Sequence, residues 1–445
     1  MDCLPRKIFT MLEALRLGLI DQRKTIHTPG SSSPSPEHAM TTYEHYLRES
    51  AVSRKTIDVF LDENEPTWAK YDGEVGYTLG RYMPRDGIDG SSTISTSQDN
   101  GQRSSRLYAE QRCRINTYGN SFTQCHQVSD GETWQEYLAA HLGEPIRNFG
   151  MGGFGVYQAY RRMRRVETSP LGAKYAILYI WGDDHCRSVM RCRHAATHRW
   201  WNDENGRMFH GNFWSNVEMD LVSGSFTERD SLLPTPESLY KMCDAEFMVE
   251  ALSDDLMVML YAMERSDVEG DVAALKALAE CLGVEGIDES DPDARRASVS
   301  ALMRAYGFAA SRYVVNEVGA FLREYDKQLM ISLLCPTATD QVLRGHKRYD
   351  REFVDYLRAA GYLVFDMNEV HREDFKAFNL SVDEYRKRYW IGHYSPAGNH
   401  FFACSIKGMI ADWLDPKPVT YRSDERIQDF EGYLPDVATG GGSRE

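Results

Sequence analysis

Five short apolar runs limit what this chain can fold into more than any other feature of its sequence. They lie at 114–119, 145–149, 174–181, 328–335 and 361–366. Continuous apolar runs of this length indicate strands buried on both faces, as in a parallel sheet whose crossovers are helices. The stretches between the runs and after the last one predict helices at 132–142, 154–166, 348–360 and 398–414. The sequence therefore predicts an α/β fold built on a parallel sheet.

Composition narrows the class of protein further. A chain of 445 residues with 42% hydrophobic and 11% aromatic content is typical of one large globular domain with insertions, or of two domains. Its net charge of -15 argues against nucleic acid or an anionic membrane surface as the main partner. The nine cysteines form no C-x-x-C pair, which favours reduced thiols over a disulfide framework.

The first part of the chain predicts a helix and linker in residues 1–36 and an extension packed on the core in 37–112. Acidic residues interrupt the apolar positions of 1–22, so no signal-peptide core is recognised, and no later window is long and apolar enough for a membrane span. A soluble cytoplasmic protein is the default expectation. The extension is expected to contain a helix around 41–62 and a loop-rich part, 65–112, that either lines a cleft or covers the sheet.

About 145 residues separate the third and fourth predicted strands, far more than an ordinary crossover needs. The core is accordingly expected in two parts, 113–190 and 327–415, with a mostly helical insertion at 191–326 and a tail at 416–445. Apolar spacing predicts helices at 236–265, 270–282, 294–306 and 308–325. The insertion is interpreted as a cap that narrows a substrate site, or as an oligomer interface.

A serine stands where the first predicted strand ends, in Gly119-Asn120-Ser121-Phe122-Thr123. A side chain at this position is presented at the carboxyl edge of the sheet, where open α/β folds bind ligands. Further along the chain come a glycine-rich block at 148–158, a Gly-Asp-Asp block at 181–185 and a histidine block at 393–399.

In order and spacing, these four blocks resemble those of the SGNH/GDSL hydrolases. The resemblance implies a three-layer α/β/α sandwich with a flavodoxin-like sheet. It also implies that Ser121 is the nucleophile and His393 the base, with the backbone N–H groups of Ser121 and Gly153 facing the oxyanion. Gly152 and Gly155 are alternatives to Gly153.

Two blocks depart from the family pattern. Asp183 stands where the family has an oxyanion-binding asparagine, and Asn120 stands where aspartate is usual, so Asn120 is a candidate to supply the missing amide. Trp390 occupies the position of the acid that orients the histidine. Either another carboxylate (Asp183, Asp184 or Asp366) or a backbone carbonyl must orient His393, and Asp183 is the predicted one because its block ends a strand beside that of Ser121.

No metal or cofactor is expected. A group of histidines and cysteines follows the third strand, but its spacing matches no standard zinc site and arginines surround it, which favours a polar helix face: His185, Cys186, Cys192, His194 and His198. The basic run 161–165 predicts a solvated helix face.

The resulting hypothesis is a serine esterase that removes an acetyl-like O-acyl group from a carbohydrate or another small ester. The sugar is suggested only by tryptophans near the blocks: Trp134, Trp181, Trp200 and Trp201. An acyltransferase with the same nucleophile is one alternative. A non-catalytic binding protein on a degraded hydrolase fold is another.

Overall fold

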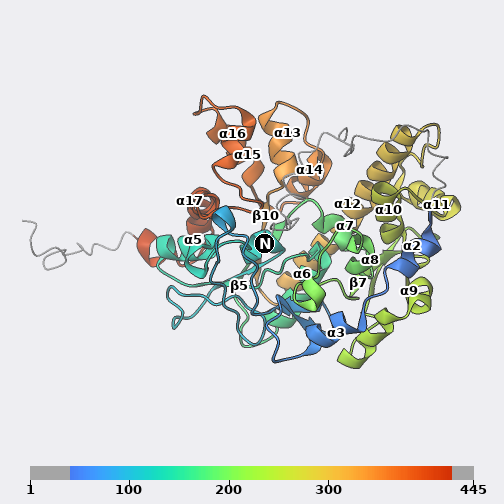
Figure 1. The fold of residues 1–445 in the computed structure, drawn as a ribbon. Coiled ribbons are helices and arrows are strands. Elements are labelled where there is room, and N and C mark those ends of the chain that lie inside the picture. The colour runs from blue at the N-terminus through green and yellow to red at the C-terminus, as the bar shows by residue number, and fades with distance from the viewer. Residues whose placement is uncertain (1–40, 423–445) are drawn as a thin grey trace, which may run out of the picture.

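The structure, a computed structural model, describes residues 41–422 and centres on a five-stranded sheet (Figure 1). All its strands are parallel, in the order β11-β10-β6-β4-β5. They are β4 (Ile115–Tyr118), β5 (Ile146–Asn148), β6 (Tyr175–Ile180), β10 (Gln328–Leu333) and β11 (Leu363–Asp366). Each lies within one of the predicted apolar runs, so the parallel sheet is confirmed.

The winding of the sheet reverses at β4. The next two strands in the chain, β5 and β6, lie on opposite sides of it. Loops that leave the carboxyl ends of β4 and β6 therefore diverge, and this switch point is where open α/β sheets bind ligands.

Helices cover both faces of the sheet because alternate strand residues point to opposite sides. In β6, Leu178 belongs to one buried cluster and Tyr179 to the other. The first face is covered by α6 (Val156–Glu167), α12 (Pro292–Glu324) and α14 (Arg351–Ala359), and the second by α5 (Trp134–Leu142), α15 (Met367–Phe375) and α17 (Pro396–Trp413). Three further short helices follow strands or precede α17: α4 (Ser121–Gln124), α13 (Pro336–Leu343) and α16 (Val382–Lys387).

Local signals account for the helix ends. Thr133 caps α5 by accepting the N–H of Glu136, and the left-handed Gly143 ends that helix. Ser395 caps α17 and Pro396 occupies its first turn. The helices α5, α6, α14 and α17 lie within a few residues of their predicted positions, whereas α13, α15 and α16 were not predicted.

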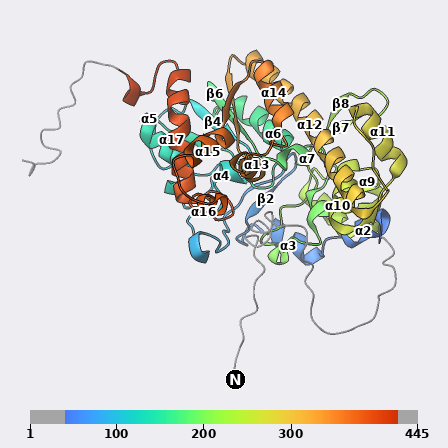
Figure 2. The same cartoon turned by 90° about the horizontal axis from the view of Figure 1, so that it is seen from above.

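The insertion between β6 and β10 forms a mostly helical half beside the sheet (Figures 1 and 2). Its elements are α7 (Asp184–Arg187), α8 (Arg193–Thr197), η4 (Glu204–Gly206), β7 (Asn216–Met219), β8 (Phe226–Arg229), η5 (Pro236–Cys243), α9 (Ala245–Leu252), α10 (Leu256–Ser266), β9 (Val268–Glu269), α11 (Val272–Leu282) and α12. The antiparallel pair β7–β8 was not predicted.

The prediction of two helices at 294–306 and 308–325 is wrong, because α12 is a single helix of 33 residues. Gly307 does not break it. A Cβ at Gly307 would lie 3.0 Å from the backbone nitrogen of Cys186 in α7, so the missing side chain serves close helix packing.

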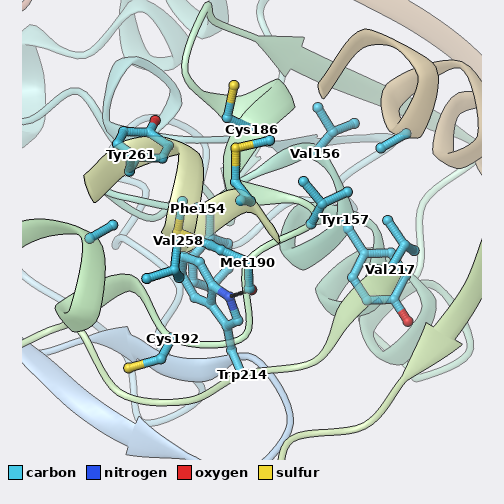
Figure 3. Close-up of a cluster of buried hydrophobic side chains, with 14 of the residues drawn as sticks. Phe154, Val156, Tyr157, Cys186, Met190, Cys192, Trp214, Val217, Val258 and Tyr261 are labelled. Atoms are coloured by element: carbon cyan, nitrogen blue, oxygen red, sulfur yellow. Dashed lines mark hydrogen bonds between the residues drawn. The ribbon is translucent and has the colours of Figure 1, made fainter. Parts of the chain in front are cut away.

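One hydrophobic cluster joins the insertion to the sheet (Figure 3). Phe154 and Tyr157 come from the chain around the start of α6, while Trp214, Val258 and Tyr261 come from the insertion. The two parts therefore share one continuous core.

The N-terminal extension consists of β1 (Thr41–Thr42), α2 (Tyr43–Glu49), α3 (Arg54–Leu61), β2 (Ala69–Asp72), β3 (Gly76–Leu79) and η2 (Ile88–Gly90). The predicted helix at 41–62 is two helices, because Ser53 caps a new start at α3. β1 pairs with β9 of the insertion. The remaining short turns are η3 (Asp130–Glu132) and η6 (Val419–Tyr421). The predicted helix at 7–23, the linker at 28–36 and the tail beyond 422 lie outside the described residues.

The basic run 161–165 is not simply a solvated face. Arg162 is 1% exposed and donates to the carbonyl of Phe149. Arg161 and Arg165 pair with Glu74. Within residues 41–422, no helix has the length and hydrophobicity that crossing a membrane requires.

Candidate functional site

The structure brings the predicted motif residues to one edge of the sheet. Ser121 opens α4 directly after β4, and Gly153 lies in the loop between β5 and α6. Asp184 begins α7 after β6, and His393 lies three residues before α17. Ser121 and His393, 272 residues apart in sequence, meet at the switch point, where His393 Nε2 lies 2.7 Å from Ser121 Oγ.

The second ring nitrogen of His393 contacts Gln127, which was not among the predicted site residues. Gln127 Oε1 lies 2.9 Å from His393 Nδ1 and accepts the backbone N–H of His393 at 2.8 Å. The Gln127 amide nitrogen donates to the carbonyl of Asp86 at 2.7 Å. Gln127 is thus held at both ends, and it orients the imidazole.

These contacts decide which nitrogen of His393 carries the proton. The backbone N–H of His393 is only a donor, so the Gln127 atom facing it must be the oxygen. That oxygen accepts the Nδ1 proton, which leaves Nε2 unprotonated. Nε2 therefore accepts the Ser121 hydroxyl proton, as a general base requires.

Gln127 has a φ of +75°, and Cys125 one of +59°, so the turn after α4 holds two side-chain-bearing residues in the left-handed region. Such backbone is kept only where surrounding contacts enforce it. Here the enforcing residue is Arg103, which is 1% exposed. Its guanidinium donates to the carbonyls of Gln124, Cys125 and Val128 at 2.7–2.8 Å.

A second histidine, His126, supports the same wall of the site. Trp68 donates its indole N–H to His126 Nδ1 at 3.3 Å, and His126 Nε2 lies 2.8 Å from the carboxylate of Asp86. Since the indole is only a donor, His126 Nδ1 is the acceptor in this contact, and Nε2 is the nitrogen that donates to Asp86. The rings of His126 and His393 pack edge to face, 5.3 Å apart.

Asp86, Trp68 and Arg103 all belong to the N-terminal extension. The extension is therefore part of the site and not merely a flap over the sheet.

Burial lowers the pKa of His393 well below its ordinary value, and the positive charge of Arg187 lowers it further. The imidazole is thus neutral at pH 7. No carboxylate offsets a positive charge on it, because its partner is an amide.

Asp184 and Asn120 form a buried pair beside Ser121. The Asn120 amide donates to Asp184 Oδ2, and Asn120 Oδ1 accepts the N–H of Phe122, which caps α4. Asp184 Oδ2 also accepts the N–H of Trp181 at 2.8 Å, and Arg187 lies 3.3 Å from Oδ1. Burial raises the pKa of Asp184 to about 7, against the opposing charge of Arg187.

The prediction that Asp183 orients His393 is wrong. The side chain of Asp183 is 43% exposed and lies 3.5 Å from Arg187. The two other carboxylates considered are also engaged elsewhere, Asp184 with Asn120 and Asp366 with Arg348. Nor does a backbone carbonyl take the acid's place, since Gln127 occupies it.

The candidate oxyanion donors differ in availability. Gly152 is not available, because its N–H donates to Gln124 Oε1 at 2.7 Å. The amide of Asn120 donates to Asp184, so it is not available to an oxyanion, for which the sequence made it a candidate. Among the described residues, the N–H groups of Ser121 and Gly153 have no acceptor.

Gly153 is suited to this position for two reasons. Its φ is +81°, which favours glycine. A Cβ there would lie 2.6 Å from Tyr77 Oη and 3.2 Å from Arg193 Nε. Any side chain would fill the space next to the free N–H.

The histidine and cysteine group after β6 does not converge on one point. His185 contacts Ser311 and packs between Phe308 and Phe353. Cys192 donates to the carbonyl of Gly211. In the part of the chain that the structure describes, the one set of three side chains able to share a metal ion is His141, His400 and Cys404, with Cys404 Sγ 3.5 Å from His141 Nε2. His141 lies at the end of α5 that leads to the amino edge of the sheet, away from Ser121.

The tryptophans do not form a common surface. Trp134 is fully buried in the core, while Trp200 is 46% exposed.

Neither a protein-family model nor a curated protein matches this chain.

Proposed function

We propose that this chain is a serine-dependent ester hydrolase of the SGNH type that works through an acyl-enzyme. The observation that carries the proposal is the contact of Ser121 Oγ with His393 Nε2 at 2.7 Å, at the switch point of the sheet. The proposal of a flavodoxin-like sandwich is supported by the strand order β5-β4-β6-β10-β11, in which the first strand lies between the second and the third.

In this mechanism Ser121 attacks the acyl carbonyl and transfers its proton to His393 Nε2. The N–H groups of Ser121 and Gly153 donate hydrogen bonds to the negatively charged oxygen of the tetrahedral intermediate. His393 then gives the proton to the leaving alcohol. Water attacks the acyl-enzyme in the second half, with His393 again as base.

The neutral partner of His393 favours esters over amides as substrates. An imidazolium next to Gln127 gains a hydrogen bond but no opposite charge, so it forms less readily than in a Ser-His-Asp site. An alcohol leaves with less help from a general acid than an amine does. The proposed base is therefore matched to the easier leaving group.

For the substrate we propose an O-acyl ester of a carbohydrate or another small alcohol. The insertion supports the cap interpretation, because Tyr261 and Arg265 of α10 line a pocket together with Asp183, which precedes α7, and Arg187, which ends it. Exposed Trp200 lies at the same pocket and offers a flat face to a ring.

The test is hydrolysis of 4-nitrophenyl acetate together with labelling by a serine-directed fluorophosphonate. Wild-type protein is expected to hydrolyse the ester and to carry the label on Ser121. Ser121→Ala should lower kcat by about 10⁶-fold, as loss of a serine nucleophile does. The exposed Ser290→Ala is the matched control and should behave as wild type.

Other outcomes assign other functions. Transfer of the acetyl group to an added sugar or glycerol, faster than to water, would identify an acyltransferase. A folded wild-type protein that neither turns over short-chain esters nor reacts with the phosphonate would refute the enzyme and favour a binding protein.

A further inference from the structure

A pocket lined by three arginines lies beside the proposed acyl site. Arg187 comes from α7, Arg193 from α8 and Arg265 from α10, and Asp183, Trp200 and Tyr261 complete its main walls. Met190 and Tyr261, which belong to the apolar cluster of Figure 3, also line this pocket. In a chain with a net charge of -15, such a concentration of positive charge calls for an explanation.

Two of the arginines have carboxylate neighbours. Arg187 lies 3.3 Å from Asp184 and 3.5 Å from Asp183, and Arg265 lies 3.6 Å from Glu264.

Arg193 has none. It is 7% exposed, yet within residues 41–422 its guanidinium makes no hydrogen bond and no ion pair. Its nitrogens are not among the fully enclosed unpaired atoms of the described residues, so they face the pocket that Arg193 lines. A nearly buried charged donor without a protein acceptor is stabilised by an anion that enters such a pocket. Burial lowers the pKa of Arg193 to about 10, which still leaves it charged at neutral pH.

Arg193 is also next to the proposed oxyanion donor. A Cβ placed on Gly153 would lie 3.2 Å from its Nε and 3.3 Å from its Cζ. The guanidinium is thus adjacent to the point where the acyl carbonyl of a substrate would bind.

We propose that Arg193 binds an oxyanion group, a carboxylate or a sulfate, carried by the ester substrate. A single negative charge fits best, because Asp183 at the same pocket repels a second one. Arg193 lies over the ring of Trp201 at 5.7 Å, so the organic part next to the anion would meet an aromatic wall. That the anion is part of a substrate rests on the proposed esterase function. The binding of an anion by Arg193 does not depend on that function.

The kinetic test compares esters that differ in one charged group. These are phenyl acetate, 4-carboxyphenyl acetate and 4-sulfophenyl acetate, with the charge on the alcohol, and phenyl hydrogen adipate, with the charge on the acyl part. Each kcat/KM is divided by the rate of uncatalysed hydrolysis. A charge-assisted hydrogen bond predicts a preference of roughly 10- to 100-fold for at least one charged ester.

The variants locate the preference. Arg193→Gln should abolish it, and Arg193→Lys should restore part of it. Arg164→Gln, at a half-exposed arginine on α6 paired with Glu228, is the control and should keep the wild-type rates.

A binding measurement separates this inference from the proposed function. Wild-type protein is titrated calorimetrically with 4-hydroxybenzoate, 4-hydroxybenzenesulfonate and phenol. Binding of an anion but not of phenol, lost in Arg193→Gln, supports the inference even if no ester is ever turned over. Ester hydrolysis without any preference for a charged substrate, and without anion binding by wild type, would overturn the inference and leave the esterase intact, whether or not the variants fold.

Discussion

Replacing Gln127 by alanine tests the arrangement on which the proposed base depends. Gln127→Ala removes the acceptor of two N–H groups of His393, at 2.8 and 2.9 Å, in a site from which water is largely excluded. Leaving buried donors unsatisfied costs about 1–3 kcal/mol, which corresponds to roughly 10- to 100-fold in rate if the imidazole loses its orientation. The expected loss in kcat is thus smaller than the roughly 10⁴-fold seen when a triad loses its acid.

The assay is steady-state hydrolysis of 4-nitrophenyl acetate, with the exposed Gln111→Ala as matched control. The variant Gln127→Glu predicts the direction in which the pKa of His393 changes. A carboxylate facing Nδ1 should raise the pKa of His393, so the acidic limb of kcat/KM should move to higher pH than in wild type. A wild-type kcat in Gln127→Ala, with a wild-type circular dichroism spectrum and activity that still requires Ser121, would refute the orienting role of Gln127.

Three further outcomes are expected. The acidic limb of wild-type kcat/KM should lie below pH 6.5, because burial lowers the pKa of His393 and the neutral base persists as the pH falls; a limb at or above 6.5 would contradict this. Arg103→Ala should lower the free energy of unfolding in urea by about 3–5 kcal/mol, since it leaves buried Asp130 with Arg106 as its one remaining ion-pair partner and leaves three backbone carbonyls without their donor. The exposed Arg81→Ala should change it little, and equal effects of the two substitutions would refute the anchoring role. Gly307→Ala should destabilise the protein by about 1–3 kcal/mol despite alanine's higher helix propensity, and a stabilised variant in the same unfolding assay would show that α12 does not need its close approach to α7.

The sequence by itself determined the sheet. Strands buried on both faces must be continuously apolar, so the five runs could be located to within a residue or two, and the helices between them followed from their spacing. Ser121 and His393 were found because their motifs are local, each carried by a strand end or by the start of a helix.

Only the tertiary structure decided how those residues are held. Gln127 meets His393 across 266 residues of sequence, and Asp86 meets Gln127 across 41. Neither contact leaves a periodic or local pattern, and an amide in the role of an acid breaks the expectation that led to Asp183. The same holds for Arg103, whose charge looks like a surface feature in the sequence and is buried in the fold. Gln127 and Arg103 act through hydrogen bonds to backbone groups of other loops. These contacts depend on how the loops pack in the folded protein, which a local sequence pattern cannot predict.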